Sequence, residues 1–422
     1  MKQMKKLTLW FAMALTLILM AGMGVCAESE VKTPTGVYQD GANSTGIRVK
    51  FVDAANCGPS NYEVQISTDK MNWQTVQADI NSSFQATVKN LSTGRSYFVR
   101  LRARRQSTGE VSDWTQPYKV STAPGNVSSP VTQTGAVTAT AGTISWGPAV
   151  GATGYDIYCT SSLTENPTCI GTTTSTSYTL KNLSKDTAYI VTVMPYTDLN
   201  VGTVNQGYVY TAGISNALTS GNSYLVRTLP EKVKNLYNFE WKANSKKITV
   251  AWQEGNVADG YELVFYNDKN KKVKTANVSF GTKAYNTYQC SKVKKNSFCK
   301  VKIRAYVTVG GKKFYSEYTK PIYCISDPKM TKGRQDNGYL SINWKKVNGA
   351  TGYDIYIGRS NTKSAYKKVA SVGKNKTSYV ATKFKGSKIT RYGKYYFYVV
   401  AKKKVKGKTY KSSVSSVYSY RK

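Results

Sequence analysis

One pattern recurs along this chain of 422 residues and restricts what it can fold into. A tryptophan that closes an apolar run is followed nine residues later by a tyrosine, which a glycine precedes and alternating polar and apolar residues follow. The copies begin at Trp146, Trp252 and Trp344, and their tyrosines are Tyr155, Tyr261 and Tyr353. A weaker copy has Phe51 in the tryptophan position and Tyr62 eleven residues later. A period of about 100 residues predicts a string of similar small domains.

A second run in each unit has a strict period of two. In the first unit, the alternate residues of this run that are expected to face the core are Tyr97, Val99, Leu101 and Ala103. Aromatic and β-branched residues in this alternation indicate strands that bury one face only. Tyr189, Cys299 and Tyr395 take the place of Tyr97 in the later units. The side chains predicted to build the cores are Phe51, Trp146, Trp252, Trp344, Tyr97, Tyr189 and Tyr395.

The combination of these runs resembles the fibronectin type III family. The shared features are the tryptophan of an early strand, the tyrosine of the next, and a leucine six residues before the tyrosine of a later strand, as in Leu91 with Tyr97. That last spacing is typical of a tyrosine corner, in which the phenol bonds to nearby backbone. The resemblance implies an all-β fold of tandem fibronectin type III-like (immunoglobulin-like) β-sandwiches. The chain departs from the family pattern at Phe51, at Cys299 and in an insertion at residues 385–393.

Proline and small residues collect at three places that separate the units. Cutting the chain there gives four predicted modules: module 1, residues 31–123; module 2, residues 124–229; module 3, residues 230–327; and module 4, residues 328–422. The connections are very short, which predicts limited swing between neighbours.

The N-terminus has the pattern of a secretory signal peptide. A short stretch with three lysines precedes an apolar run from Leu7, and Val25-Cys26-Ala27 supplies a small-residue cleavage site before Glu28. Residues 1–27 are therefore expected to be removed, the alternative being an uncleaved anchor. No later segment reaches 18 consecutive apolar residues, so we expect no transmembrane span in the mature chain. The predicted location is secreted or extracellular, with possible association with the cell wall.

Six cysteines remain outside the signal peptide, and an exported protein is free to form disulfides. Cys159 and Cys169 flank a predicted turn between two strands, which makes them the expected pair. The pairing of Cys57, Cys290, Cys299 and Cys324 stays open, since any two of the last three could bond. Free buried thiols are the alternative.

The composition argues against catalysis. The chain has no histidine, which removes the usual general base and the commonest metal ligand. Asp156, Glu262 and Asp354 recur beside the strand tyrosine, but an acid on the outer face of a strand is expected to be solvated. No phosphate loop or calcium loop is present. We predict no enzyme activity, no cofactor and no metal.

Charge is the least ordinary property of the chain. The net charge is +37, and it is distributed as +4, −1, +11 and +22 over modules 1 to 4. Such asymmetry gives the C-terminal half a long-range attraction for anionic polymers. The densest basic run consists of Lys402, Lys403, Lys404, Lys406 and Lys408. Supporting charge is expected from Lys383, Lys385, Lys388, Arg391 and Lys394. These residues are predicted to bind an anionic cell-wall polymer or an anionic glycan, the alternative being a surface that only aids solubility.

Two functions from different classes fit the sequence. The first is a non-catalytic extracellular scaffold or adhesion protein, held at the bacterial envelope by its basic C-terminal modules, with modules 1 and 2 free to bind a protein or carbohydrate. The second is a carbohydrate-binding accessory of a polysaccharide-degrading system, in which outward tyrosines with Trp73 or Trp114 stack on sugar. Salt separates the two, because it weakens ionic attachment and leaves stacking unchanged. No nucleic acid partner is expected.

Overall fold

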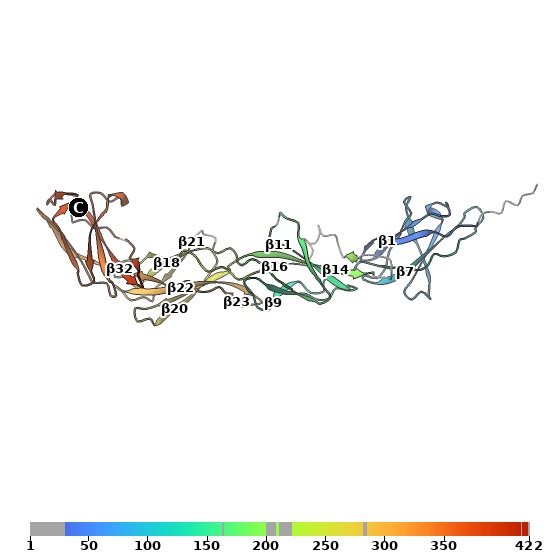
Figure 1. The fold of residues 1–422 in the computed structure, drawn as a ribbon, viewed down its shortest axis with the longest axis horizontal. Coiled ribbons are helices and arrows are strands. Elements are labelled where there is room, and N and C mark those ends of the chain that lie inside the picture. The colour runs from blue at the N-terminus through green and yellow to red at the C-terminus, as the bar shows by residue number, and fades with distance from the viewer. Residues whose placement is uncertain are drawn as a thin grey trace, which may run out of the picture.

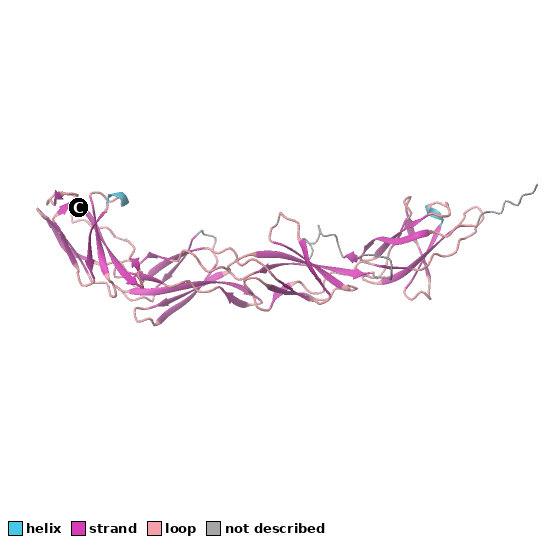
Figure 2. Ribbon diagram, viewed as in Figure 1, coloured by secondary structure: helices cyan, strands magenta, loops and turns pink. Residues whose placement is uncertain are grey.

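The computed structural model describes residues 30–162, 164–199, 208–210, 222–281, 285–414 and 416–420. The predicted signal peptide, residues 1–27, lies outside them. The described residues form antiparallel strands and two short 3₁₀ turns, η1 (Pro59–Asn61) and η2 (Lys363–Ala365). The four modules follow one another along the long axis, with module 1 at one end and module 4 at the other (Figures 1 and 2). None of the described residues belongs to a helix long and apolar enough to cross a membrane.

Module 1 consists of two four-stranded sheets. They have the orders β1-β2-β6-β5 and β4-β3-β7-β8. The strands are β1 (Thr35–Asn43), β2 (Gly46–Val52), β3 (Tyr62–Ser67), β4 (Gln74–Val76), β5 (Ala78–Ile80), β6 (Gln85–Val88), β7 (Ser96–Ala103) and β8 (Tyr118–Ser121).

Module 2 has a sheet of order β13-β10-β9 and a second of order β12-β11-β14-β15, in which β16 also pairs with β14. The strands are β9 (Thr132–Thr134), β10 (Gly142–Ser145), β11 (Gly154–Thr160), β12 (Thr168–Thr173), β13 (Ser177–Leu180), β14 (Ala188–Asp198), β15 (Tyr208–Tyr210) and β16 (Ser223–Arg227).

Module 3 repeats this arrangement with sheets of order β17-β18-β21 and β20-β19-β22-β23, in which β24 also pairs with β22. The strands are β17 (Tyr237–Glu240), β18 (Ile248–Gln253), β19 (Gly260–Tyr266), β20 (Lys272–Ser279), β21 (Tyr285–Cys290), β22 (Phe298–Val309), β23 (Lys312–Tyr315) and β24 (Ile322–Ile325).

Module 4 has sheets of order β25-β26-β29 and β28-β27-β32-β33, and a small hairpin of β30 and β31. The strands are β25 (Met330–Asp336), β26 (Tyr339–Trp344), β27 (Gly352–Gly358), β28 (Lys367–Gly373), β29 (Ser378–Ala381), β30 (Lys383–Phe384), β31 (Ser387–Lys388), β32 (Tyr396–Val405) and β33 (Lys408–Lys411). The predicted insertion at residues 385–393 contains this hairpin's turn.

Every module therefore consists of two antiparallel sheets around one core, with similar strand orders that differ in their edge strands. The prediction of an all-β chain built from fibronectin type III-like sandwiches is confirmed. Each module has its own cluster of buried side chains. The named strands all lie within the four predicted ranges, although the core cluster of module 4 also takes in Ile325 from β24. The module boundaries themselves stay predictions.

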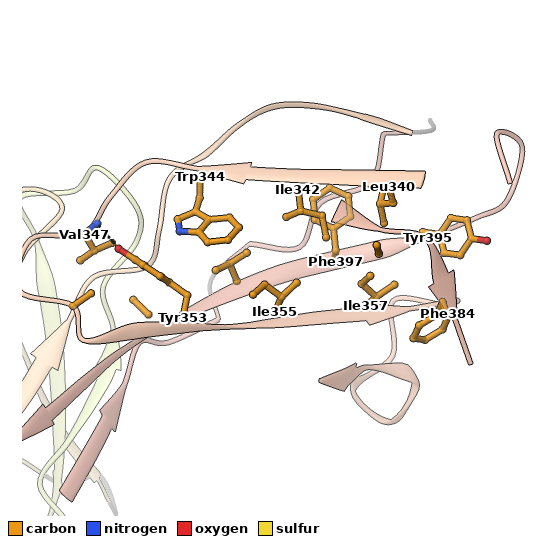
Figure 3. Close-up of a cluster of buried hydrophobic side chains, with 14 of the residues drawn as sticks. Leu340, Ile342, Trp344, Val347, Tyr353, Ile355, Ile357, Phe384, Tyr395 and Phe397 are labelled. Carbon is orange, nitrogen blue, oxygen red and sulfur yellow. Dashed lines mark hydrogen bonds between the residues drawn. The ribbon is translucent and has the colours of Figure 1, made fainter. Parts of the chain in front are cut away.

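The recurring tryptophan and tyrosine meet inside the cores of modules 2, 3 and 4. The rings of Trp344 and Tyr353 have centroids 5.4 Å apart, and Trp146 with Tyr155 and Trp252 with Tyr261 repeat the contact at 5.3 Å. In module 4 the Tyr353 hydroxyl accepts a 2.9 Å hydrogen bond from the Val347 N–H (Figure 3). Because an apolar core cannot satisfy a phenol, the chain six residues earlier supplies a backbone partner. Ala149 and Gly255 play this part for the other two tyrosines.

The later tyrosines lie near the start of the long central strands. Tyr97 accepts a 3.0 Å bond from Ser92 N–H, and Tyr189 a 2.8 Å bond from Ser184 N–H, as in a tyrosine corner. Tyr395 is fully buried, but its hydroxyl has no hydrogen-bond partner among the described residues. Of the remaining predicted core residues, Phe51, Trp146, Trp252, Trp344 and Tyr97 are buried, whereas Tyr189 is partly buried against its cluster.

The contact between modules 2 and 3 combines apolar and ionic groups. Val137 of module 2 packs with Val307 and Val309 of module 3. Arg227 forms an ion pair with Asp259 and donates a 3.0 Å bond to the carbonyl of Thr308. The apolar packing and the polar contacts of Arg227 together oppose bending at this junction.

The contact between modules 1 and 2 is a close approach of backbones instead. Gly94 and Gly151 both have positive φ, 61° and 75°. A Cβ on Gly94 would lie 2.3 Å from the carbonyl oxygen of Val150, so this contact requires glycine.

The predicted disulfide between Cys159 and Cys169 is wrong. Both are free thiols, and Cys159 is buried while Cys169 is exposed. In the pairing of β11 with β12, Cys159 lies opposite Thr168 and Cys169 lies opposite Tyr158. A one-residue offset turns the two side chains to opposite faces of the sheet, so the sulfurs cannot meet.

In modules 3 and 4 the large sheet ends in a lysine-bearing strand. The outermost strand is β4, β12, β20 and β28 in modules 1 to 4 respectively. β20 carries Lys272 and Lys274, and β28 carries Lys367 and Lys368. Register shifts interrupt the pairing of β12, β20 and β28 with their neighbours.

Candidate polyanion-binding surface of module 4

The predicted basic residues fall into two groups at opposite ends of β32. The distal group comprises Lys383, Lys385, Lys388, Arg391 and Lys394, which lie before the start of the strand. The junction group comprises Lys402, Lys403, Lys404, Lys406 and Lys408, which lie at its end and in β33. A ten-residue strand is about 30 Å long. The ten residues therefore do not form one patch.

The β30–β31 hairpin positions the lysines of the distal group. Lys385 and Gly386 form its turn with φ values of 51° and 82°, as a tight two-residue hairpin requires. Phe384 and Ile389 are buried in the core cluster of module 4 and anchor the hairpin. Lys385 and Lys388 are exposed between these anchors, and Lys383 is exposed just before the first of them. The alternation of anchor and lysine thus displays the charges on a fixed support.

The loop that carries Arg391 is fastened to the neighbouring strand β25. The side-chain amide of Gln335 donates to the carbonyls of Thr390, at 3.0 Å, and Gly393, at 2.6 Å. The Arg391 N–H donates a 2.9 Å bond to the side chain of Asn337. Arg391 and Lys394 remain exposed. These backbone bonds leave the charged ends of both side chains available to solvent.

Acids are scarce around this group. Module 4 has two, Asp336 and Asp354, against 24 lysines and arginines. Asp336 lies on β25 and forms a 2.6 Å ion pair with Arg334. A backbone bond from Asn337 and this ion pair hold the pKa of Asp336 below its usual range, and Arg391 adds to the effect. Among the described acids none is within salt-bridge distance of a distal-group cation, so none of those five cations forms an ion pair with a described acid.

The junction group behaves differently, because two of its members have partners. The Lys402 amine lies 2.5 Å from Oδ1 of Asp354, whose side chain is only 4% exposed. The hydroxyl of Ser371 also donates to this carboxylate, at 2.5 Å. Burial by itself raises the pKa of Asp354, but these two bonds outweigh it and the pKa is lowered. Lys402 therefore forms a structural ion pair, and its charge is not available to a ligand.

Lys403 points to module 3. Its amine lies 3.9 Å from the centre of the Phe298 ring, and burial lowers its pKa. Tyr323 and Tyr410 make a second aromatic contact between the modules, with ring centres 5.3 Å apart. Lys404, Lys406 and Lys408 are exposed around the Lys406-Gly407 turn. The exposed part of the junction group is thus three lysines.

The recurrent strand acids are not solvated as predicted. Besides Asp354, Asp156 accepts bonds from the hydroxyls of Thr172 and Tyr210, both at 2.7 Å. Glu262 forms a 2.8 Å ion pair with Arg304 and also accepts from Tyr318. Sequence reasoning placed them on the outer face but did not identify the cross-strand partners that cover them. Each is a structural contact within its sheet.

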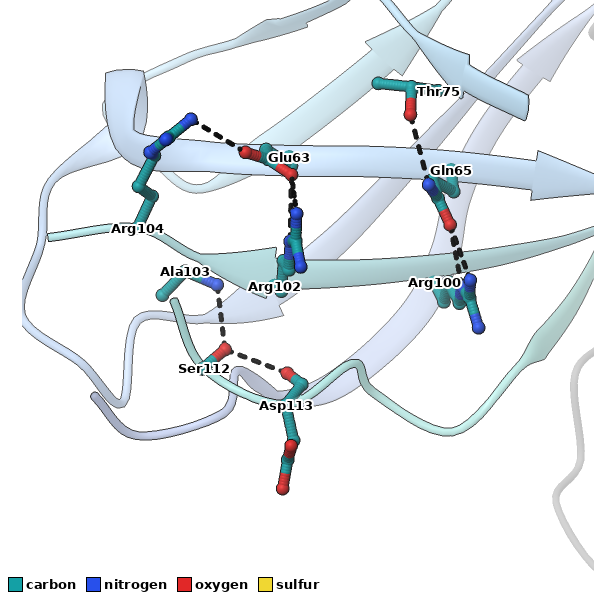
Figure 4. Close-up of polar contacts among 9 residues, drawn as sticks. All are labelled: Glu63, Gln65, Thr75, Arg100, Arg102, Ala103, Arg104, Ser112 and Asp113. Atoms are coloured by element: carbon teal, nitrogen blue, oxygen red, sulfur yellow. Dashed lines mark hydrogen bonds and ion pairs between the residues drawn. The ribbon is translucent and has the colours of Figure 1, made fainter. Parts of the chain in front are cut away.

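Trp73 and Trp114, the residues that a sugar-binding function would use, both face arginine. The Arg100 guanidinium lies 4.1 Å from the centre of the Trp73 ring and 4.7 Å from that of Trp114. Arg102 lies 4.5 Å from Trp114 and pairs with Glu63, while Gln65 accepts from Arg100 (Figure 4). The ring faces in these contacts are occupied and not free to stack on a ligand.

A cavity in module 2 was not foreseen from the sequence. It has a volume of about 720 Å³ and lies between β12 and β13, where Tyr178 reaches across to the carbonyl of Ile170. Asn166, Lys181 and Tyr189 are among its lining residues. A gap between two sheets depends on tertiary geometry, and no local sequence motif predicts it. No group of three potential metal ligands occurs among the residues that the structure describes.

Comparison with known proteins gives only structural similarity. No family model matches the chain, and no curated protein matches it. The FN1–FN3 domains of chicken CNTN1 align with 69% of this chain and 98% of their own length, at 18% identity and a TM-score of 0.29. A two-domain fibronectin type III segment from chicken tenascin aligns with 47% of this chain and all of its own, at 16% identity and a TM-score of 0.25. The fold assignment accordingly rests on the sheets described above.

Proposed function

We propose that the chain is a non-catalytic extracellular scaffold or adhesion protein that module 4 holds at an anionic surface polymer of a bacterial envelope. The observation that carries the proposal is the distal group: five exposed cations on a fixed hairpin and loop, with no described acid in salt-bridge distance. Each added cation deepens the local positive potential, and a polymer with many negative charges gains from all of them at once.

The ligand class follows from the form of the surface. The distal group is displayed on a hairpin and an adjoining loop, and none of its members lines a described cavity. Such a surface suits a long chain with repeated charges, such as an anionic cell-wall polymer or an anionic glycan. The exposed lysines of the junction group, Lys404, Lys406 and Lys408, offer a second contact to a ligand that is long enough.

The arrangement of modules agrees with an anchoring role. Module 4 lies at one end of the string and module 1 at the other (Figure 1). The net charges of modules 1 and 2 are only +4 and −1. An anchored module 4 would leave the two weakly charged modules away from the surface, where their loops are free to meet a protein or carbohydrate.

The test is binding of the mature chain, residues 28–422, to purified cell wall across a salt series. We expect binding at low salt that weakens as ionic strength rises. A variant with Lys383, Lys385 and Lys388 replaced by glutamine should lose at least tenfold in affinity. The matched control replaces Lys345, Lys374 and Lys376, exposed lysines of the same module, and loses the same charge. Equal losses in both variants, or none in the first, would contradict the distal group as anchor.

The cavity in module 2 supports a second candidate, carbohydrate recognition. Hydroxyl and amide groups dominate its lining, and Tyr178 and Tyr189 supply aromatic surface. A neutral saccharide suits such a lining, whereas Trp73 and Trp114 are occupied by arginine. Retention on neutral polysaccharide that persists at high salt and is lost in Tyr178→Ala would favour this function. Retention that is lost at high salt would instead indicate ionic binding.

A further inference from the structure

Module 3 differs from modules 1 and 2 at two facing positions of its sandwich. Tyr97 lies directly opposite Val120 in the pairing of β7 with β8. Tyr189 lies opposite Val226 in the pairing of β14 with β16. At the same place in module 3, Cys299 of β22 lies opposite Cys324 of β24. The tyrosine and the valine are both replaced, and both replacements are cysteine.

The two cysteines have the placement that a cross-strand disulfide needs. Both are free thiols in the structure, both are buried, and both belong to the core cluster of module 3. Directly opposed residues of antiparallel strands have Cα atoms about 4.5 to 5.5 Å apart. Disulfides span Cα distances of roughly 4.4 to 6.8 Å. Bond formation therefore requires no shift of either strand.

The third cysteine of the module has no such partner. Cys290 belongs to the same core cluster, but it lies on β21 in the other sheet, where Ile248 is its cross-strand neighbour. Cys290 is near enough to Cys299 to help raise the pKa of that thiol, but it is not the cross-strand neighbour of Cys299. Register thus selects one pair out of the three that the sequence allowed.

We propose that Cys299 and Cys324 form a structural disulfide in module 3, which takes the place of the tyrosine corner. In modules 1 and 2 the phenols of Tyr97 and Tyr189 bond to the backbone before the strand. Cys299 has no phenol, so that bond is lost, and the disulfide ties the start of β22 to β24 instead. The two thiols give two electrons and two protons to a small-molecule disulfide, which is reduced to two thiols while the Cys299–Cys324 bond forms.

Burial determines when this reaction takes place. The attacking species in disulfide exchange is the thiolate. Burial, with the neighbouring Cys324, raises the pKa of Cys299 well above its usual value. The reduced pair is therefore inert once the sandwich has closed, and oxidation belongs to the folding stage. The same burial protects the finished bond from reductants.

The first test maps the bond in the full mature chain. The protein is refolded with oxidised and reduced glutathione, its remaining thiols are alkylated in denaturant, and it is digested with trypsin. Cleavage separates the three cysteines of module 3 into residues 284–292, 296–300 and 314–329. We expect 296–300 linked to 314–329, and Cys290 alkylated. Alkylation of both Cys299 and Cys324, or a link to Cys290, would overturn the proposal.

The second test measures what the bond does, and it does not depend on the mapping. Reduction in denaturant followed by refolding without oxidant should lower the unfolding midpoint of module 3 by more than about 5 °C, because the link closes a loop of 24 intervening residues. A variant with Cys299→Tyr and Cys324→Val restores the pair of modules 1 and 2 and should show no dependence on reduction. Cys290→Ser is the matched control and should keep the dependence. The same dependence in the double variant, or its loss in Cys290→Ser, would count against the assignment.

Discussion

Lys402 and Asp354 form an ion pair across two central strands of module 4, with the amine 2.5 Å from the carboxylate. Lys402 belongs to the densest basic run of the sequence, yet its charge is used within the sheet. Lys403 next to it contacts Phe298 of module 3. A count of lysines in that run therefore overstates the charge that a ligand would meet.

Replacing Asp354 with asparagine should destabilise module 4. The change removes the ion pair and weakens the bond from Ser371, and it leaves the partly buried Lys402 amine without its counter-charge. We expect a loss of about 1–3 kcal/mol in the free energy of unfolding, measured by denaturant titration. Asp336→Asn is the control, because Asp336 pairs with an exposed arginine and should cost less than about 1 kcal/mol. Equal losses would contradict a special role for Asp354.

The same carboxylate makes stability depend on pH. Its pKa is lowered in the folded state from an ordinary value of 3.8. A depressed folded pKa means that the stabilisation is present above the unfolded pKa and is lost as pH falls through the folded one. Module 4 should therefore lose stability as the pH is lowered below about 4. Unfolding midpoints between pH 6 and 2 measure this, and the decline should be shallower in Asp354→Asn.

Two buried tyrosines of module 4 should respond differently to loss of the hydroxyl. Tyr353→Phe leaves the buried N–H of Val347 without an acceptor and should cost about 1–2 kcal/mol. Tyr395→Phe removes a hydroxyl that has no described partner, so its effect should be neutral or stabilising. Chemical denaturation of both variants provides the comparison. A larger loss for Tyr395→Phe would show that its hydroxyl has a partner.

Arg100 should contribute to the stability of module 1 through its aromatic neighbours. It lies over Trp73 and Trp114, and Gln65 accepts hydrogen bonds from it. Arg100→Ala is expected to cost about 1–2 kcal/mol in unfolding free energy and to raise the solvent exposure of both indoles. Tryptophan fluorescence reports the exposure. Arg95→Ala, whose guanidinium lies 6.0 Å from the Tyr97 ring, should change stability by less than about 0.5 kcal/mol.

Arg227 should control the bend between modules 2 and 3. Arg227→Ala removes its ion pair with Asp259 and its bond to Thr308, but it leaves the apolar contact of Val137 with Val307 in place. We expect a smaller radius of gyration in small-angle scattering, because the string is then free to bend. Arg334→Ala breaks a pair inside module 4 and should leave the radius unchanged. An unchanged radius in Arg227→Ala would place the stiffness in the other contacts between the two modules, such as the apolar contact and the ion pair of Lys185 with Glu231.

Features encoded by short spacings were predictable from the sequence. The nine-residue step from Trp344 to Tyr353 fixes two strands and the loop between them, and its repetition identified the sandwich. The six-residue step from Leu91 to Tyr97 predicted a corner that is present. Both patterns lie within one stretch of chain, where backbone geometry leaves few alternatives.

Features that depend on distant partners were not predictable. The partner of Lys402 is 48 residues earlier in the chain, and that of Lys403 is in another module. The sequence predicted a disulfide between Cys159 and Cys169, but the strand register offsets the two residues by one position. The bulge that sets this register has no evident sequence marker. The two basic groups, in the same way, are close in sequence but lie at opposite ends of one strand.

The outermost strands β20 and β28 affect whether two copies of the chain can associate through their sheet edges. An unpaired strand edge is a template for another copy, and a string of sandwiches has such edges along its whole length. Lys272 and Lys274 on β20, and Lys367 and Lys368 on β28, would have to approach like charges of a second chain. The register shifts beside these strands also bend and twist the sheet edge, which makes it less suited to pairing with a strand of another chain. The lysines of these two edge strands therefore disfavour edge-to-edge aggregation, and replacing them with neutral residues would cost solubility.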